Sequence, residues 1–323
     1  MAGSSSSNRP LNAVNLLSAA VKLYRSRLNQ LLSVAFTATL WNLPPLLAAL
    51  VLAGVTGFVI TTSPNSVGLV SLLSIVLWLG WIVLVLYCYA KSLMNTALIS
   101  RLAYGELISH PESIQESRGH LDRKTWKFLW TSVLVGLILF VVSFSINIAV
   151  AIAVSLVEGV FGETSALAGL VSLVLNLAAL VTAYWLQVCL FISEVPLAVE
   201  TKNSSVESIR RGWELSRGAA GQIFLAIMLA GLITLPLIIL AFIPFILTLI
   251  ANISLLVVAS QGQIPAQAAV VALLMSLTIS ILLVLFLSIF IIPFWQSLKA
   301  LIYFNLRGWH EGPELQLRDN SLN

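Results

Sequence analysis

The chain has 323 residues, of which 59% are hydrophobic and only 9% are charged, with a net charge of +4. Soluble domains carry about 25% charged residues, and a mean hydropathy of +0.99 leaves too few polar side chains to cover a water-exposed surface. Two cysteines and 18 glycines also exclude a disulfide scaffold and a collagen-like fibre. The composition predicts a polytopic membrane protein.

The first thirty residues divide into a polar tail at 1–10 and an amphipathic segment at 11–30. The apolar residues of this segment recur at helical spacing, which predicts a helix lying in the membrane interface with its bases on headgroups. The predicted apolar stripe consists of Leu11, Val14, Val21, Tyr24, Leu28 and Leu31.

Six apolar stretches follow, each at least as long as the roughly 20 residues that a helix needs to cross a bilayer. They are too long and too continuously apolar for barrel strands, so we expect an all-α integral membrane protein with six transmembrane helices. The predicted spans are Leu32–Thr61, Val67–Ala90, Phe128–Leu156, Ala166–Val195, Ile223–Ala259 and Ala268–Phe294.

The bases show which side of the membrane each connection faces. All 17 Lys and Arg residues lie before span one, between spans two and three, between spans four and five, or after span six. Under the positive-inside rule, both termini are predicted to be cytoplasmic, in a bacterial inner membrane or an internal membrane. Bases along a membrane face indicate contact with anionic lipid and not with nucleic acid.

A shift of 95 residues superimposes two parts of the chain. It aligns Ser109, Glu112 and Ser113 with Ser204, Glu207 and Ser208, and it also aligns two Gly-Leu-Ile runs. Each Ser-x-x-Glu predicts a capping box that starts a short cytoplasmic helix before a two-span hairpin. The predicted organisation is a polar tail at 1–10, repeat units at 11–105, 106–200 and 201–312, and a polar tail at 313–323.

The helix predicted after Ser204 carries an apolar stripe of Val206, Ile209 and Trp213, with bases beside it. Such helices, including the interfacial helix at the start of the chain, either form a purely structural collar or offer a surface for anionic lipid or a partner protein. On the second interpretation, the candidate contact residues are Lys22, Arg25, Arg27, Arg123, Lys124, Lys127, Arg210, Arg211 and Arg217.

Ionisable groups inside the predicted spans are scarce, although intramembrane sites usually depend on them. Glu194 is the one acid within a predicted span, beside Pro196, and either reaches the interface or couples an ion. Prolines interrupt spans one and five, as kinks or as a broken-helix transport site. The candidate transport residues are Asn42, Pro44, Pro236 and Glu194.

The sequence contains no P-loop, no HExxH and no Gly-x-Ser-x-Gly, and its three histidines are scattered. We therefore expect no enzyme activity, no cofactor and no metal site. Glu158 and Glu163 could hold a cation on the outer side, but two carboxylates are weak evidence.

Three segments together resemble a bacterial six-span family, the membrane domain of glycerophosphoryl diester phosphodiesterases. They are Ala20–Arg27 (AVKLYRSR), Ser205–Gly218 (SVESIRRGWELSRG) and Ala300–Gly312 (ALIYFNLRGWHEG). The phosphodiesterase barrel that names the family has no counterpart in this chain. The resemblance therefore implies a helical membrane module with cytoplasmic termini and no phosphodiesterase activity.

The function predicted from these features is a non-enzymatic membrane scaffold or accessory subunit. Its nine candidate contact bases on the cytoplasmic side would bind anionic lipids or a larger membrane protein complex. The alternative is a transporter or lipid-translocating protein that uses the proline-broken spans one and five.

Overall fold

The computed structural model describes residues 12–62, 67–162, 165–200, 203–260 and 266–311, and across these residues its regular structure is helical. Six stretches are long and apolar enough to cross a membrane, which confirms the predicted all-α membrane fold. The predicted tails at 1–10 and 313–323, and Glu163, lie outside the described residues. The six stretches are Leu28–Thr56, Ser74–Leu107, Thr125–Phe161, Ala166–Val199, Ala220–Ile250 and Leu274–Glu311.

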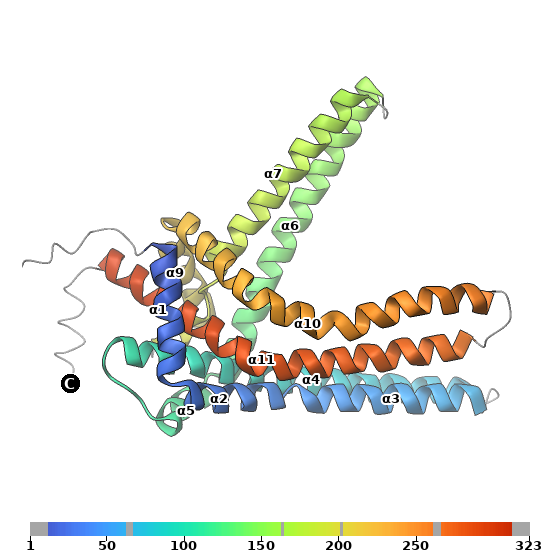
Figure 1. Ribbon diagram of the computed structural model, residues 1–323, viewed down its shortest axis with the longest axis horizontal. Coiled ribbons are helices and arrows are strands. Elements are labelled where there is room, and N and C mark those ends of the chain that lie inside the picture. Colours follow the sequence, from blue (N-terminus) through green and yellow to red (C-terminus); the bar gives the residue numbers. More distant parts are fainter. Residues whose placement is uncertain (1–11, 63–66, 163–164, 201–202, 261–265, 312–323) are drawn as a thin grey trace, which may run out of the picture. The chain divides into compact units, whose positions relative to one another are not determined.

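Eleven helices make up the described part of the chain (Figure 1). They are α1 (Ala13–Ser26), α2 (Leu28–Leu40), α3 (Leu43–Thr62), α4 (Val67–Leu107), α5 (Ile114–Asp122), α6 (Thr125–Phe161), α7 (Ala166–Leu190), α8 (Val195–Val199), α9 (Ser205–Arg217), α10 (Ala220–Ser260) and α11 (Ala266–Glu311).

By their contacts, the residues fall into two units. Unit 1 comprises Met1–Ala19, Ser100–Ile227 and Leu298–Asn323, and unit 2 comprises Ala20–Ile99 and Met228–Ser297.

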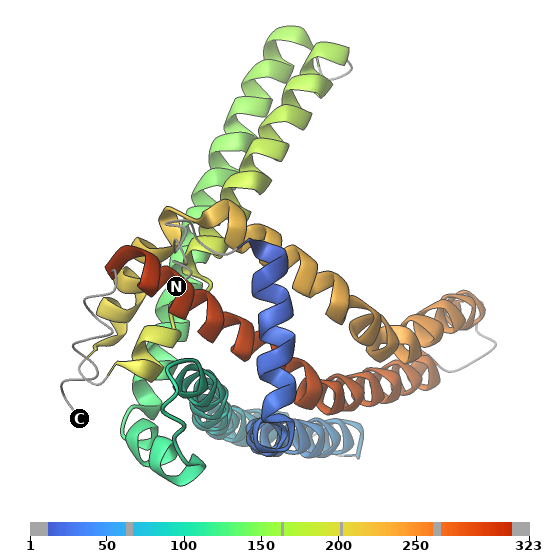
Figure 2. The same ribbon diagram turned by 60° about the vertical axis from the view of Figure 1, so that its left-hand side comes forward.

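Unit 1 contains a helical hairpin and the short helices at its base. α6 and α7 run side by side along the hairpin in both views (Figures 1 and 2). α9 packs on both of them through Ile209, which is buried against Leu186 and Leu190 of α7. The edge-on contact between Trp185 and Trp213, with ring centroids 5.4 Å apart, extends this apolar cluster.

Unit 2 contains α2 and α3, which are separated by a break at Trp41–Asn42, and parts of α4, α10 and α11. Pro44 and Pro45 fall in the first turn of α3, where their missing N–H groups cost no helical hydrogen bond. The Trp81 indole donates to the Pro45 carbonyl at 2.8 Å. α10 remains helical through Pro236 and Pro244, so neither proline ends the helix.

The element order agrees with the predicted repeat, because α5 precedes the α6–α7 hairpin and α9 precedes α10 and α11. The repeat itself stays a prediction. The capping box at Ser204 and Glu207 is confirmed. The one predicted at Ser109 and Glu112 is wrong, because α5 is capped four residues later by Ser113.

Two charge-assisted bonds explain the shift of this cap. Glu112 accepts both from the guanidinium of Arg101, one at each carboxylate oxygen, so this carboxylate is held by the cation and not by the Ser109 backbone N–H that a capping box would use. Ser109 instead follows the end of α4 with a left-handed φ of 58°.

The short helices also bury apolar side chains against protein. In α1 the buried positions are Ala13, Leu16, Ala20 and Leu23, whereas Val14 of the predicted lipid-facing stripe is 57% exposed, as a side chain in contact with lipid would be. In α9, Ile209 faces protein and not lipid, and Val206 is exposed. Both helices therefore bury apolar side chains against protein. The prediction considered only contact between these helices and lipid.

Candidate functional site

The base of unit 1 holds a set of ion pairs and charged hydrogen bonds, which we call the ion-pair cluster. Its members come from α4, from the connections before α5 and before α6, from the segment between α7 and the middle of α9, and from the end of α11. They are Arg101, Glu112, Lys124, Glu194, Glu200, Arg211, Lys299, Tyr303, Arg307 and Glu311.

The segment that connects α7 to α9 is fixed by a close backbone approach. A Cβ atom added at Gly212 would lie 2.8 Å from the Ser193 Cα, so only glycine allows α9 to lie this near the turn. The buried Ser208 hydroxyl donates to the Ser193 carbonyl at 2.5 Å. At the start of α9, Ser204 and Glu207 form the capping box, which satisfies backbone N–H groups that would otherwise lack partners.

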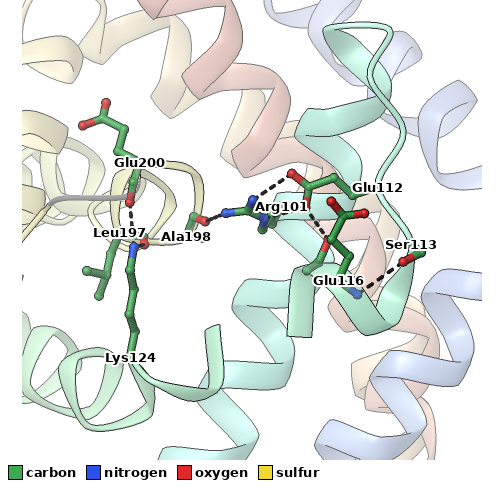
Figure 3. A network of polar contacts seen from close by, with 9 residues as sticks. Arg101, Glu112, Ser113, Glu116, Lys124, Leu197, Ala198 and Glu200 are labelled. Atoms are coloured by element: carbon green, nitrogen blue, oxygen red, sulfur yellow. Dashed lines mark hydrogen bonds and ion pairs between the residues drawn. The ribbon is translucent and has the colours of Figure 1, made fainter. Parts of the chain in front are cut away.

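Arg101 and Glu112 form an ion pair in which two nitrogens of the guanidinium bond the two oxygens of the carboxylate (Figure 3). Arg101 Nε donates to Glu112 Oε2 and Nη2 donates to Oε1, both at 2.7 Å. The Ser117 hydroxyl donates to the same carboxylate at 2.5 Å. The two charged side chains are only 11% and 20% exposed. Burial by itself raises the pKa of the Glu112 carboxyl, but these hydrogen bonds and the Arg101 charge outweigh it and leave that pKa below its ordinary value.

Two cations also hold the C-terminal end of α8. Arg101 Nη1 donates to the Ala198 carbonyl at 3.1 Å, and Lys124 Nζ donates to the carbonyls of Leu197 at 3.1 Å and Glu200 at 2.6 Å (Figure 3). Carbonyls at a helix end lack helical partners and carry partial negative charge, so they favour cations there. Burial lowers the pKa of Lys124, and the nearby positive charges of Arg101 and Lys127 lower it further.

Glu200 connects α8 to the end of α11 and to α9. Its carboxylate accepts from the Tyr303 hydroxyl at 2.6 Å and from the Asn203 amide at 2.5 Å. Arg211 Nε lies 3.6 Å from the same carboxylate. The side chain of Glu200 thus joins three chain segments, although no pattern near it in the sequence indicates such a role.

The end of α11 supplies the remaining pairs. Arg211 forms an ion pair with Glu311, which also accepts from Arg307 Nε at 2.9 Å. Arg307 Nη1 donates to the Tyr104 hydroxyl at 2.8 Å. A further pair joins Lys299 Nζ to Glu194 Oε1 at 2.7 Å, with the ammonium 4.9 Å from the Phe191 ring centroid. The carboxylates of the cluster all have cationic or hydroxyl donors, so the arrangement holds chain segments together.

The nine predicted contact bases separate into two groups. Lys124 and Arg211 belong to the ion-pair cluster, and Arg27 is half-buried and donates to Gln30 at 3.1 Å. The other six are exposed: Lys22, Arg25, Arg123, Lys127, Arg210 and Arg217. Arg210 pairs with Glu214 of its own helix at 2.8 Å. Four of the exposed six belong to unit 1, and Lys22 and Arg25 belong to unit 2.

The candidate transport residues are divided between the units as well. Asn42 donates to the Ser92 hydroxyl at 3.1 Å, and Pro44 and Pro236 are exposed on α3 and α10. These three belong to unit 2, whereas Glu194 belongs to unit 1, where it pairs with Lys299.

Comparison with other proteins adds no functional assignment. No family model, no curated protein sequence and no solved structure matches the chain. Among the described residues, no group of three or more His, Cys, Asp or Glu side chains is placed to hold a metal ion. The inference of function therefore depends on the geometry.

Proposed function

We propose that the protein is a non-enzymatic membrane scaffold or accessory subunit that docks anionic lipid or a partner protein through its exposed bases. The observation that carries this proposal is the balance of exposed charge over the described residues. Six bases are exposed, against the four acids Glu116, Asp122, Glu207 and Glu214, whereas the acids of the ion-pair cluster are held in internal pairs. An excess of exposed bases suits an anionic surface or partner.

The test neutralises the six exposed bases together, as Lys22→Gln, Arg25→Gln, Arg123→Gln, Lys127→Gln, Arg210→Gln and Arg217→Gln. The protein is then extracted gently from its native membrane, and co-purifying lipids and proteins are identified by mass spectrometry. The matched control exchanges Lys for Arg and Arg for Lys at the same positions. We expect the neutral variant to lose its associated lipid or protein and the control to keep it. Equal retention by both variants contradicts the proposal.

We infer in addition that the basic connections and both termini face the cytoplasm. Support comes from the distribution of all 17 bases along one predicted side of the membrane. A cysteine in place of Lys127 should resist a membrane-impermeant maleimide in intact cells, and one in place of Glu158 should react. The opposite labelling pattern contradicts this orientation.

A second candidate function, transport, draws support from the neutral polar side chains of unit 2. Thr39 and Ser288 hydroxyls lie 3.1 Å apart, Asn42 bonds Ser92, and the buried Ser280 hydroxyl has no partner among the described residues. Transport predicts that cysteines at Asn42 and Pro236 react with aqueous thiol reagents in at least one state. Protection of both in every state excludes this function.

A further inference from the structure

The first turns of α6 and the residue two positions before them, Arg123, present an exposed set of two aromatic and two basic residues. Trp126 is 55% exposed and Trp130 is 60% exposed. Arg123 and Lys127 are exposed too. Because residues three and four apart lie on one side of a helix, Trp130 neighbours both Trp126 and Lys127, and Arg123 lies just before this turn of α6.

The opposite side of the same turns is packed against protein. Thr125, Phe128, Leu129 and Thr131 are buried there. The two tryptophans are therefore not core residues turned outward by a distortion of the helix. Indole rings are amphipathic and are enriched where hydrocarbon meets water, and Lys and Arg in the same zone contact headgroups.

Charges of both signs lie near this face. Lys124 lies between Arg123 and the start of α6, where burial, Arg101 and Lys127 disfavour its charged form and Glu200 favours it. Glu112, the acid bound to Arg101, is held in its own ion pair. Two acids also lie near: Asp122 precedes Arg123, and Glu207 of α9 interacts with Lys127. Arg123, Lys124 and Lys127 thus outnumber the neighbouring Asp122 and Glu207 at the N-terminal end of α6, where the helix dipole is also positive.

The length of α6 places this face near one end of a span. α6 has 37 residues, about 56 Å, which exceeds the hydrocarbon core of about 30 Å. The neighbouring apolar stretch, Ala166–Val199, runs through α7 and α8 and is nearly as long. A helix of this length would carry its first turns out of the hydrocarbon and into the headgroup layer.

We propose that Arg123, Trp126, Lys127 and Trp130 form a binding site for anionic phospholipid headgroups at the bilayer surface. This inference rests on the proposed docking function and names the lipid class and the residues. The bases would bind the phosphate by charge-assisted hydrogen bonds, and the indoles would lie between headgroups and acyl chains. Two exposed indoles beside two bases favour a bilayer over a partner protein, because this combination matches both layers of an interface.

The experiment reconstitutes the full chain in nanodiscs that contain phosphatidylglycerol and phosphatidylcholine, and native mass spectrometry counts the lipids retained after release. The variants are Arg123→Gln/Lys127→Gln and Trp126→Ala/Trp130→Ala. The comparison variant is Arg210→Gln/Arg217→Gln, which removes two exposed bases from α9. The control is Arg123→Lys/Lys127→Arg, which keeps both charges. Neutralising Arg123 and Lys127 should lower phosphatidylglycerol retention about 30-fold, the α9 variant should lower it less, and the control should leave it within about twofold. The tryptophan variant should lower the retention of both lipids.

The outcomes separate this inference from the proposed function. An equal loss in the α6 and α9 variants overturns the α6 site and leaves docking by the exposed bases standing. If neither variant changes lipid retention, the α6 site is overturned, and the six-base variant then decides the proposed function. If the α6 variants release a co-purifying protein and no lipid, the face is a protein interface and the lipid site is overturned.

Discussion

Units 1 and 2 both bury polar side chains, but of different kinds. Unit 1 uses ionised groups such as Arg101 with Glu112 and Lys299 with Glu194. Unit 2 joins neutral groups of different helices, such as Thr39 with Ser288 and Asn42 with Ser92, and its Arg27 bonds the neutral Gln30. Charges inside hydrocarbon are costly, whereas hydroxyl and amide contacts there contribute about 0.6 kcal/mol each. The difference indicates that unit 1 depends on electrostatics for its structure and unit 2 depends on helix packing.

Breaking the Arg101–Glu112 pair should give the largest effect. We expect Arg101→Gln to lower the free energy of unfolding by about 3–5 kcal/mol, because it leaves a partly buried carboxylate without its cation. Thermal unfolding in detergent measures the loss. The matched control is Arg210→Gln, which breaks a pair of similar length, 2.8 Å, on an exposed surface, where solvent screening should leave the stability almost unchanged. Equal costs would show that unit 1 does not depend on its buried charges.

Acidification should weaken the same pair to a smaller extent. The pKa of Glu112 is lower in the folded protein than its ordinary value, so its stabilising contribution is present above the ordinary pKa and is lost as pH falls through the folded-state pKa. Stability should therefore decline below about pH 4.3, and Glu112→Gln should flatten this part of the pH profile. An unchanged profile in the variant contradicts the role of Glu112.

Gly212→Ala tests the close approach of α9 to the turn after α7. The added methyl would overlap the Ser193 backbone, and we expect a loss of about 1–3 kcal/mol from overpacking. Gly136→Ala in α6 is the control, since nothing lies within 4 Å of its added Cβ. That change should be neutral or stabilising by up to about 1 kcal/mol. Similar results for both variants would argue against a tight α9 contact.

The smallest effect is expected in unit 2. Asn42→Leu removes the amide contact with Ser92 and should cost about 0.6 kcal/mol. Asn176→Leu serves as its control, because that amide bonds Ser172 within its own helix and the side chain is exposed. A loss of several kcal/mol for Asn42→Leu would mean that unit 2 also depends on a polar network.

The sequence predicts the helical membrane fold well, because six long apolar runs have few other stable structures. It predicts span ends less well. Span two was predicted to end at Ala90, yet α4 continues to Leu107, since Lys91 and Arg101 are tolerated where the helix packs in protein. The ion-pair cluster could not be predicted. Arg101 and Ala198, or Glu200 and Tyr303, are about a hundred residues apart and meet only through tertiary packing.

The same limit explains the mixed outcome for the predicted contact bases. Lys124 and Lys127 are equivalent in the sequence, three residues apart at the start of one span. In the structure, Lys124 caps carbonyls of the α8 segment and Lys127 is exposed. Which lysine turns inward depends on the position of Leu197 and Glu200, and no local pattern encodes that position.

These two lysines allow the most direct test of the account. Lys124→Gln and Lys127→Gln each remove one charge, and each variant is measured for unfolding temperature and for anionic lipid retained per folded molecule. We predict that Lys124→Gln lowers the unfolding temperature and leaves lipid retention unchanged. Lys127→Gln should lower lipid retention and leave the unfolding temperature unchanged. If both variants change the same property, or if the two effects are exchanged, the division between structural and docking bases is wrong.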